Sequence, residues 1–268
     1  MILFPPAKIN LGLRILRKRA DGYHDLETVL LPVPWRDALE VIRSDTFSFQ
    51  TSGLPIPGQA ESNLCVKAYR LLQSDFNLPP VAVHLHKIIP MGAGLGGGSS
   101  DAASMLMLLN DLFELALSPS ELEAYAAQLG SDCPFFINPR PRLATGTGTT
   151  LEALPLDLSS KHLVIVYPNV SVTTAAAYAR VVPRQPDSDL RELLTQPLAA
   201  WKDRVVNDFE DSVFQHHPTL ADIKEQLYHT GATYASLSGS GSALYGLFDK
   251  PADLPEGWEE YTVWEGEL

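Results

Sequence analysis

The feature that most constrains this chain is a glycine-rich stretch over 90–101, which reads Pro-Met-Gly-Ala-Gly-Leu-Gly-Gly-Gly-Ser-Ser-Asp. Over 102–109 apolar residues then recur at three- and four-residue spacing, which predicts a helix. The stretch therefore predicts a glycine loop that opens a helix. The first turn of a helix has free N–H groups and the positive end of the dipole, and glycines let the backbone approach an anion closely. Phosphate is accordingly the ligand that this stretch favours.

Two familiar phosphate-binding patterns do not fit this stretch. A Walker A loop needs Gly-Lys-Ser/Thr at its end, and no Lys lies between Pro90 and Ser100. The dinucleotide-binding pattern is matched literally by Gly92, Gly94 and Gly97. A second helical pattern follows, however, where a strand and a ribose-binding acid should come. A different phosphate loop and a flexible glycine turn before a core helix remain as alternatives.

Composition narrows the class of protein. With 268 residues the chain has room for one large or two ordinary domains, and its 45 % apolar content argues against disorder. Neither a bilayer-crossing run nor a signal segment is found, and Cys65 and Cys133 are too few for a disulfide framework or a thiolate metal site. We therefore expect a soluble, cytoplasmic enzyme with reduced cysteines.

The net charge of −12 argues against nucleic acid as a partner. It also works against a phosphorylated ligand at long range, so cations close to the glycine loop are needed. Lys8 and Asn10 share one face of a strand predicted over 5–16, where they either line an exposed face or meet one ligand. Lys87 lies near the end of another predicted strand, over 81–89, just before the glycine loop. His84 and His86 share a face of that strand without a third metal ligand nearby.

An aspartate follows a predicted helix over 119–129. The helix starts with a capping box at Ser118 and Glu121 and ends at Gly130, and Asp132 comes directly after it. An Asp at a helix exit is usually a turn residue. Here the next residues include two phenylalanines, so the carboxylate needs a cation or hydrogen bonds to satisfy it.

Several segments together resemble the GHMP kinases (galactokinase, homoserine kinase, mevalonate kinase and relatives). The glycine stretch resembles their ATP loop, Ser-Asp-Cys-Pro-Phe-Phe over 131–136 resembles their segment with the catalytic aspartate, and the glycine-rich segment over 234–243 resembles their third motif. Pro-Ala-Lys-Ile-Asn-Leu-Gly-Leu over 6–13 and Arg-Ala-Asp-Gly-Tyr-His-Asp-Leu-Glu-Thr over 19–28 resemble one branch of the family. That branch phosphorylates the 2-hydroxyl of 4-diphosphocytidyl-2-C-methyl-D-erythritol in the non-mevalonate pathway to isoprenoid precursors.

The resemblance implies an α+β fold in two domains with the active site in the cleft between them. Residues 1–156 would form an N-terminal domain like ribosomal protein S5 domain 2. Residues 157–268 would form a ferredoxin-like C-terminal domain.

The resemblance also implies roles for residues. Lys8 and Asp132 would be catalytic, with Asp132 accepting the hydroxyl proton and Lys8 keeping it ionised. ATP, with Mg²⁺, would be bound by Pro90, Met91, Gly92, Ala93, Gly94, Leu95, Gly96, Gly97, Gly98, Ser99, Ser100, Asn63 and Lys87. The cytidylyl substrate would be bound by Asn10, Tyr23, His24, Thr174, Tyr178 and Gly239, with the two tyrosines stacking on the cytosine.

Other interpretations stay open at this point. Another GHMP small-molecule kinase, the related diphosphomevalonate decarboxylase, and a non-catalytic nucleotide-binding protein on the same fold would share most of these residues. Only a small-molecule partner is expected, with no membrane or nucleic acid, in a monomer or weak homodimer. The basic cluster of Arg14, Arg17, Lys18 and Arg19 is either a solvated face or lies near substrate phosphates.

Overall fold

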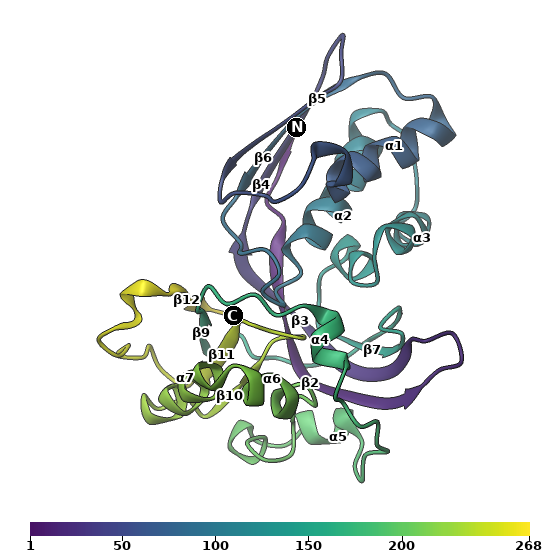
Figure 1. Cartoon of the computed structure of the whole chain (residues 1–268). Helices are drawn as coiled ribbons and strands as arrows, with labels where there is room; N and C mark the ends of the chain where they lie inside the picture. The colour runs from purple at the N-terminus through teal and green to yellow at the C-terminus, as the bar shows by residue number, and fades with distance from the viewer. The chain divides into compact units, whose positions relative to one another are not determined.

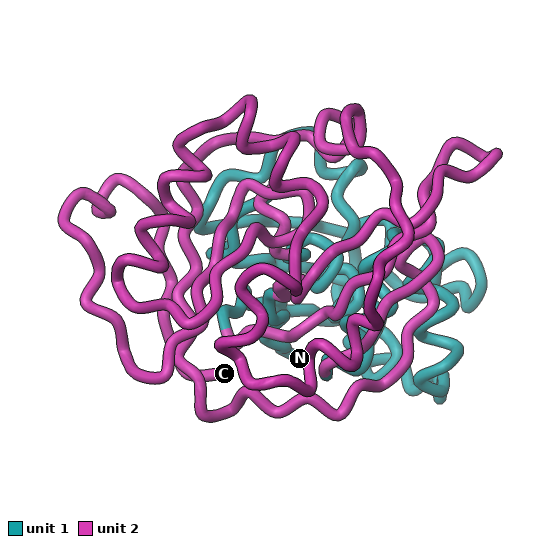
Figure 2. Tube along the Cα trace, turned by 90° about the horizontal axis from the view of Figure 1, so that it is seen from below, with its two compact units in different colours: residues 1–7, 35–91, 96–140 teal, residues 8–34, 92–95, 141–268 magenta.

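The computed structural model describes residues 1–268 and divides them into two compact units (Figures 1 and 2). Unit 1 consists of Met1–Ala7, Trp35–Met91 and Gly96–Arg140, and unit 2 of Lys8–Pro34, Gly92–Leu95 and Pro141–Leu268. The units therefore interleave along the chain, and the glycine stretch contributes to both. The expected single boundary between residues 156 and 157 stays a prediction.

Unit 1 contains a four-stranded sheet in the order β1-β4-β6-β5. Its strands are β1 (Ile2–Leu3), β4 (Ala38–Arg43), β5 (Ser48–Gly53) and β6 (Val81–Lys87). Strand β6 pairs antiparallel with β4 and parallel with β5. Buried and exposed residues alternate along most of β6, as expected of a strand with one covered face.

Helices of unit 1 lie beside one another next to this sheet (Figure 1). They are α1 (Leu64–Phe76), α2 (Gly97–Leu112) and α3 (Pro119–Leu129), with the short 3₁₀ helices η1 (Ala60–Ser62) and η2 (Cys133–Ile137). The apolar spacing after the glycine loop is confirmed, because Ala102, Met105, Leu106 and Leu109 are all fully buried on α2. The predicted capping box at Ser118 and Glu121 is present at the start of α3.

Unit 2 contains two further sheets. One has the order β2-β3-β7-β8, with β2 (Pro6–Lys18), β3 (His24–Arg36), β7 (Arg142–Gly146) and β8 (Thr150–Ala153). The other has the order β10-β11-β9-β12, with β9 (His162–Tyr167), β10 (Tyr234–Leu237), β11 (Leu244–Phe248) and β12 (Thr262–Glu267). The second sheet is antiparallel throughout. Strand β2 begins within residues assigned to unit 1, and strand β3 ends within residues assigned to unit 1.

The helices of unit 2 are short except for one. They are α4 (Thr174–Tyr178), α5 (Leu190–Leu194), α6 (Glu210–His216) and α7 (Pro218–His229), with the 3₁₀ helices η3 (Leu198–Ala200) and η4 (Trp258–Glu260). Helix α7 packs on β10 and β11. Its Leu220, Ile223 and Leu227 enter a core that also holds Val164 and Leu244 of the sheet.

Local structure differs from the sequence prediction at three places. The region 44–60, whose polar residues, glycines and prolines are typical of a loop, contains β5, because a partly polar segment gains ladder hydrogen bonds by pairing with β6. Ser62, a residue type that favours helix N-caps, does not cap α1. The Asn63 side chain accepts from Cys65 N at 2.8 Å instead, and Ser62 Oγ donates to Gln59 O. Gly130 ends α3 in an extended conformation and not in the left-handed one typical of a C′ glycine.

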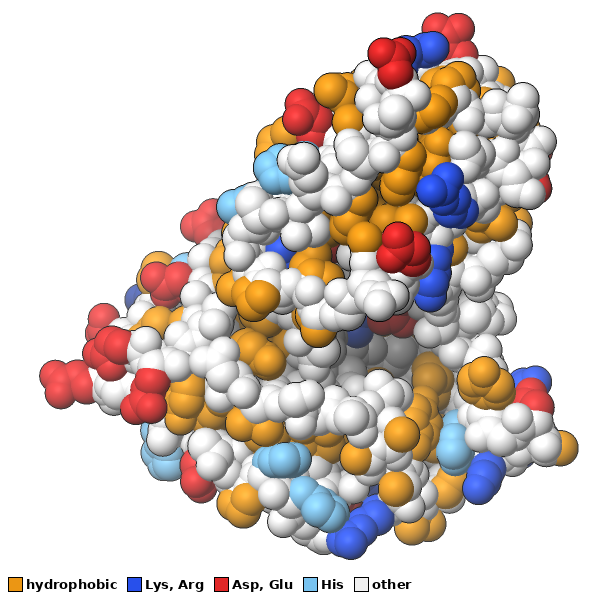
Figure 3. Space-filling view, turned by 45° about the horizontal axis from the view of Figure 1, so that its top comes forward, with side chains coloured by type: hydrophobic (Ala, Val, Ile, Leu, Met, Phe, Trp, Pro, Cys, Tyr) orange, Lys and Arg blue, Asp and Glu red, His pale blue; other side chains and the backbone are white.

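Two further observations concern the helices and the charged surface of the chain. None of the helices combines the length and apolar character needed to cross a membrane. Acidic side chains gather at the left of the space-filling view (Figure 3), on the side where the C-terminal segment lies in Figure 1.

Candidate active site

Residues 92–95 of the glycine stretch, which belong to unit 2, contact the turn between β10 and β11. The left-handed φ of Gly94, +78°, is one that favours glycine, and a Cβ there would lie 1.9 Å from the carbonyl oxygen of Ser238. The Ser238 hydroxyl donates to Gly94 O at 2.9 Å, and Ala243 N donates to Ala93 O at 3.0 Å. This turn belongs to the third motif, and its Gly239 lies against Asn10 and Gly94.

Lys8 reaches the same carbonyl group. Its backbone N–H donates to Leu95 O, and its Nζ donates to Gly94 O, each at 2.9 Å. Nζ also donates to Asn10 Oδ1 at 2.6 Å, and the Asn10 amide donates to Thr28 Oγ1 at 3.1 Å. Lys8 is 3 % exposed and Asn10 4 %, so the interpretation of this strand face as exposed is wrong. A cation is held where the glycine stretch passes through unit 2.

The rest of the stretch, in unit 1, forms the start of α2. Gly96, at φ +69°, precedes the helix, and Ser100 N donates the first intrahelical bond to Gly96 O. The N–H groups of residues 97–99 have no partner within the helix, a feature that favours anions at a helix N-terminus. A Cβ at Gly97 would lie 2.8 Å from Lys87 Nζ, so the lysine amine lies close to the start of the helix.

Lys87 forms a buried cluster with two carboxylates. Its amine donates to Asp37 Oδ2 and, at 2.8 Å, to Asp101 Oδ2, and its side chain has no exposed surface. Burial alone would lower the pKa of Lys87, but the two carboxylates outweigh it and raise that pKa. Asp37 Oδ1 accepts from the backbone N–H groups of Ile88 and Ile89, at 2.6 and 2.9 Å. The cluster ties the end of β6 to the N-terminal part of α2, at its fifth residue. The predicted contact of Lys87 with ATP stays a prediction.

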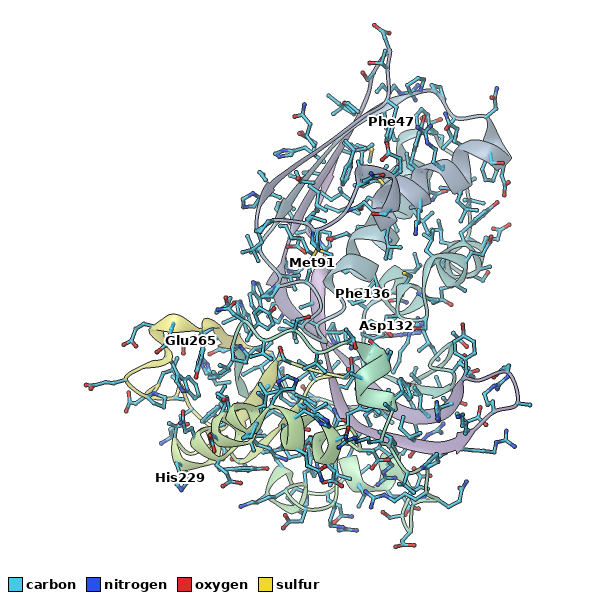
Figure 4. All side chains as sticks on the ribbon, viewed as in Figure 1. Phe47, Met91, Asp132, Phe136, His229 and Glu265 are labelled. Carbon is cyan, nitrogen blue, oxygen red and sulfur yellow. The ribbon has the colours of Figure 1, made fainter.

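Asp132 lies directly before η2, which packs against α2 and α3 (Figure 4). Its side chain is half-buried, whereas Phe135 and Phe136 after it are fully buried, as the sequence indicated. Burial raises the pKa of the neighbouring Cys133 thiol to about 11, although a hydrogen bond with the Ser99 side chain opposes this rise. Within unit 1, η2 and the first turn of α2 are thus adjacent.

The aromatic residues predicted to hold a cytosine are arranged differently from one another. The rings of His24 and Tyr178 stack with centroids 4.8 Å apart and planes 23° apart, which is direct contact. Tyr178 also meets Phe209 edge-on at 4.8 Å. Tyr23 is 67 % exposed and so does not belong to a core. In this structure the ring stacked on Tyr178 is that of His24.

Three other predicted positions have local partners. Asn63 caps α1, as described above, and its predicted place beside adenine stays a prediction. Thr174 opens α4 and its hydroxyl lies 3.4 Å from Ser240 Oγ, in the turn that contains Gly239. In the basic cluster, Arg17 and Arg19 form exposed ion pairs with Asp25. Arg14 is buried with Glu27, and Lys18 ends β2 on the surface.

Sequence reasoning missed two buried polar residues that support these positions. Asp37 stands alone between two apolar strand segments, and an isolated acid there is the signal that a buried cation needs a partner. Asn207 precedes α6 and both hydrogens of its amide are used by the β10–β11 turn. An Asn before a helix is usually interpreted as a cap, so its second role is visible only in three dimensions.

The fold and these motifs define a class of kinases. Two family models match the chain, GHMP kinases N terminal domain over residues 63–138 and GHMP kinases C terminal over residues 188–262. The chain belongs to the GHMP kinase family, and its architecture is the α+β fold of that family.

Particular relatives can be named within this class. The chain is 49 % identical over its full length to 4-diphosphocytidyl-2-C-methyl-D-erythritol kinase of Parabacteroides distasonis, which it covers completely. It is 52 % identical to the protein of the same name from Bacteroides thetaiotaomicron, with 96 % of this chain and 95 % of the relative covered.

Solved structures agree with this placement. A crystal structure of 4-(cytidine 5'-diphospho)-2C-methyl-D-erythritol kinase superposes with a TM-score of 0.82 at 31 % identity, covering 99 % of this chain and 98 % of that chain. Homoserine kinase from Cytophaga hutchinsonii, at 16 % identity and a TM-score of 0.67 over 98 % of this chain and 95 % of that chain, shares the fold alone.

Proposed function

We propose that this chain is an ATP-dependent small-molecule kinase of the non-mevalonate isoprenoid pathway. Its acceptor is the 2-hydroxyl of 4-diphosphocytidyl-2-C-methyl-D-erythritol, and its products are the 2-phosphate and ADP. The observation that carries the proposal is full-length identity of about half to kinases of that name, in a chain that contains Lys8, Asp132 and the glycine stretch.

The triphosphate of ATP is the ligand for the start of α2. Three backbone N–H groups without intrahelical partners, glycines at 97 and 98, and the dipole of a sixteen-residue helix support this assignment. Nothing lies within 4 Å of a Cβ built at Gly98, so the surface above this turn is open. The buried Lys87 balances charge on Asp37 and Asp101 near the helix start, which reduces the repulsion of a phosphate by these two carboxylates.

Magnesium would neutralise charge on the phosphate oxygens that develops during transfer. The oxygen atoms that the first turn of α2 offers are the hydroxyls of Ser99 and Ser100. Ser100 Oγ is buried without a hydrogen-bond partner, which fits a group that acquires one when the nucleotide site is filled.

Two residues are assigned to the transfer step itself. A new bond forms between the acceptor oxygen and the γ-phosphorus as the bond from that phosphorus to the ADP oxygen breaks. Asp132 accepts the proton that the hydroxyl releases. Lys8 supplies positive charge that stabilises the developing alkoxide.

The acceptor side is assigned to unit 2. Tyr23 offers an exposed ring to a pyrimidine, and the stacked pair of His24 and Tyr178 offers a polar edge and a second aromatic face. Asn10, Thr174 and Gly239 supply polar contacts nearby. We propose further that the enzyme is soluble and acts on small molecules in the cytoplasm.

A coupled ADP-release assay tests this function. The chain should release ADP with the cytidylyl substrate and at most at background rate with mevalonate, homoserine or galactose. Preference for one of the other three acceptors would overturn the substrate assignment. Binding of ATP and the cytidylyl ligand without any turnover would favour a non-catalytic protein instead.

A further inference from the structure

Asn207 is a buried side chain whose hydrogen bonds are all directed at the backbone. It is 3 % exposed, and its Nδ2 donates to the carbonyl groups of Leu237 and Gly239, each at 2.8 Å. Its Oδ1 accepts from Phe209 N at 3.0 Å. Only one orientation of the amide satisfies two acceptors and one donor at once, so the side chain is fixed.

The two carbonyl groups belong to the turn that contacts the glycine stretch. Leu237 and Gly239 flank Ser238, and the Ser238 hydroxyl donates to Gly94 O. The same Gly94 oxygen accepts from Lys8 Nζ at 2.9 Å. A continuous chain of hydrogen bonds and turn residues therefore leads from Asn207 through Ser238 to Gly94 and the Lys8 amine.

The segment that carries Asn207 is itself anchored on the strand that carries Lys8. Leu13 N donates to Val206 O at 2.9 Å and Asp208 N donates to Leu13 O at 2.8 Å, so Asn207 sits between two backbone bonds to β2. Lys8 lies on the same strand. Both ends of the hydrogen-bond chain are thus fixed to one element.

A second buried group holds the same turn. Glu210 Oε1 accepts from Leu237 N at 2.9 Å and from Ser236 Oγ at 3.0 Å, and Lys224 Nζ donates to Glu210 Oε2 at 2.6 Å. Glu210 therefore fixes the end of β10, while Asn207 is the side chain that reaches past it to Gly239. Loss of Asn207 would release the turn and leave β10 in place.

We infer that Asn207 is a positioning residue for phosphoryl transfer, which sets Gly94 and the Lys8 amine by fixing the Ser238–Gly239 turn. The kinetic part of this inference rests on the proposed function, because the role of Lys8 does. Asn207 acts through the turn and contacts neither the triphosphate nor the acceptor. Misplacement of a reacting group by about 1 Å can reduce a rate by about 10²-fold, so the effect is expected mainly in kcat.

The test compares Asn207→Asp and Asn207→Ala with the control Gln226→Met. In Asn207→Asp one carboxylate oxygen can still accept from Phe209 N. The other oxygen replaces the amide nitrogen and faces the carbonyl groups of Leu237 and Gly239, to which it cannot donate when ionised. Gln226 Oε1 accepts from Nε1 of the buried Trp258 at 2.7 Å, so its loss also removes a side-chain hydrogen bond from a buried residue, away from the turn. At temperatures where all variants are folded, we expect kcat to fall about 10- to 100-fold in both Asn207 variants and less than twofold in the control.

The pH profile separates positioning from a general structural defect. A carboxyl facing two carbonyl groups has a raised pKa and, when protonated, donates one hydrogen bond. The rate of Asn207→Asp relative to wild type should therefore rise several-fold from pH 8.5 to 6, while that of Asn207→Ala stays flat. Asp208, Glu210, Lys224 and Arg184 surround this segment in both variants, so the alanine variant corrects for their titration.

Hydrogen exchange supplies a readout independent of catalysis. The amides of Ala243 and Lys8, which donate to Ala93 and Leu95, should exchange at least tenfold faster in the Asn207 variants and unchanged in Gln226→Met. Exchange and kcat that match the control would overturn the inference. If wild type has no turnover, the proposed function fails, and unchanged exchange at these two amides would still overturn the positioning role of Asn207.

Discussion

The two parts of the glycine stretch are held by different chemistry. In unit 1 the start of α2 rests on a buried ionic cluster, in which Lys87 pairs with Asp37 and Asp101. In unit 2 residues 92–95 are held by hydrogen bonds from the backbone, from the Ser238 hydroxyl and from Lys8. The support in unit 1 depends on the balance of buried charges. The support in unit 2 depends on hydrogen bonds and on close backbone packing.

This difference separates what each support can tolerate. Two buried carboxylates with one ammonium are sensitive to any change in charge, because an uncompensated charge in a low dielectric is costly. A turn packed on Gly94 is sensitive to any added atom, because a Cβ has no space there. We therefore expect stability to depend mainly on the unit 1 support and the catalytic rate mainly on the unit 2 support.

The largest stability effect is expected for Lys87→Met. Removal of the ammonium leaves two buried carboxylates uncompensated, which should cost about 3–5 kcal/mol of unfolding free energy. Urea unfolding monitored by circular dichroism measures this. The control Lys161→Met, which breaks an exposed pair with Asp249, should cost less than about 1 kcal/mol. Equal losses of unfolding free energy in the two variants would show that the buried ionic cluster contributes no more to stability than an exposed ion pair.

Gly94→Ala should affect the rate more than the stability. A Cβ at 1.9 Å from Ser238 O forces the turn and the loop apart by more than an ångström, and we expect kcat/KM for ATP to fall about 10²-fold. Steady-state kinetics measure it. Gly257→Ala is the matched control, since Gly257 has a left-handed φ of +97° like Gly94 but nothing lies within 4 Å of its Cβ, and it should stay within a few fold of wild type. A comparable loss in the control would show that a side chain at a left-handed φ, and not the contact with Ser238, lowers the rate.

Tyr23→Ala should weaken binding of the acceptor without unfolding the chain. Stacking of a base on an aromatic ring is worth about 1–3 kcal/mol, so KM for the cytidylyl substrate should rise about 10- to 100-fold. The melting temperature should change little, because the ring is mostly exposed. An unchanged KM would leave the pyrimidine to the His24 and Tyr178 pair alone.

Asp101→Asn should flatten the pH dependence of stability. Burial raises the pKa of Asp101 to about 7, although Lys87 opposes the rise, whereas an unfolded Asp titrates near 3.8. Because the folded chain keeps this proton after the unfolded chain has lost it, stability falls as the pH rises from about 4 to 7, by at most about 1.4 kcal/mol per pH unit, and levels off above 7. Unfolding free energies at pH 5 to 8, without nucleotide or magnesium, should fall less steeply in the asparagine variant. Parallel curves would place the titration elsewhere.

How much of this could be predicted from the sequence depends on the range of the interactions. The glycine loop, the capping box at Ser118 and the buried face of α2 follow from local patterns and are confirmed. Strand β5 was missed, because its partner β6 is distant in the chain and its own pattern is weak.

The candidate site shows the same division. Lys8 and Asp132 were singled out through motifs, whereas the sequence around Asp37 and Asn207 does not identify the groups that they bind. Their partners, Lys87 for Asp37 and Gly239 for Asn207, lie 50 and 32 residues away. The exposure of Tyr23 and the stacking of His24 on Tyr178 likewise depend on the tertiary fold.

The most direct test of the account is the turnover of Asp132→Asn with ATP and the cytidylyl substrate, together with the calorimetric Kd of a non-hydrolysable ATP analogue. Asp132 is assigned to the acceptor hydroxyl and the start of α2 to the triphosphate. The rate of Asp132→Asn should therefore be lowered about 10²- to 10⁴-fold, with a nucleotide Kd within a few fold of wild type. Near-normal turnover, or loss of nucleotide binding together with activity, would contradict it.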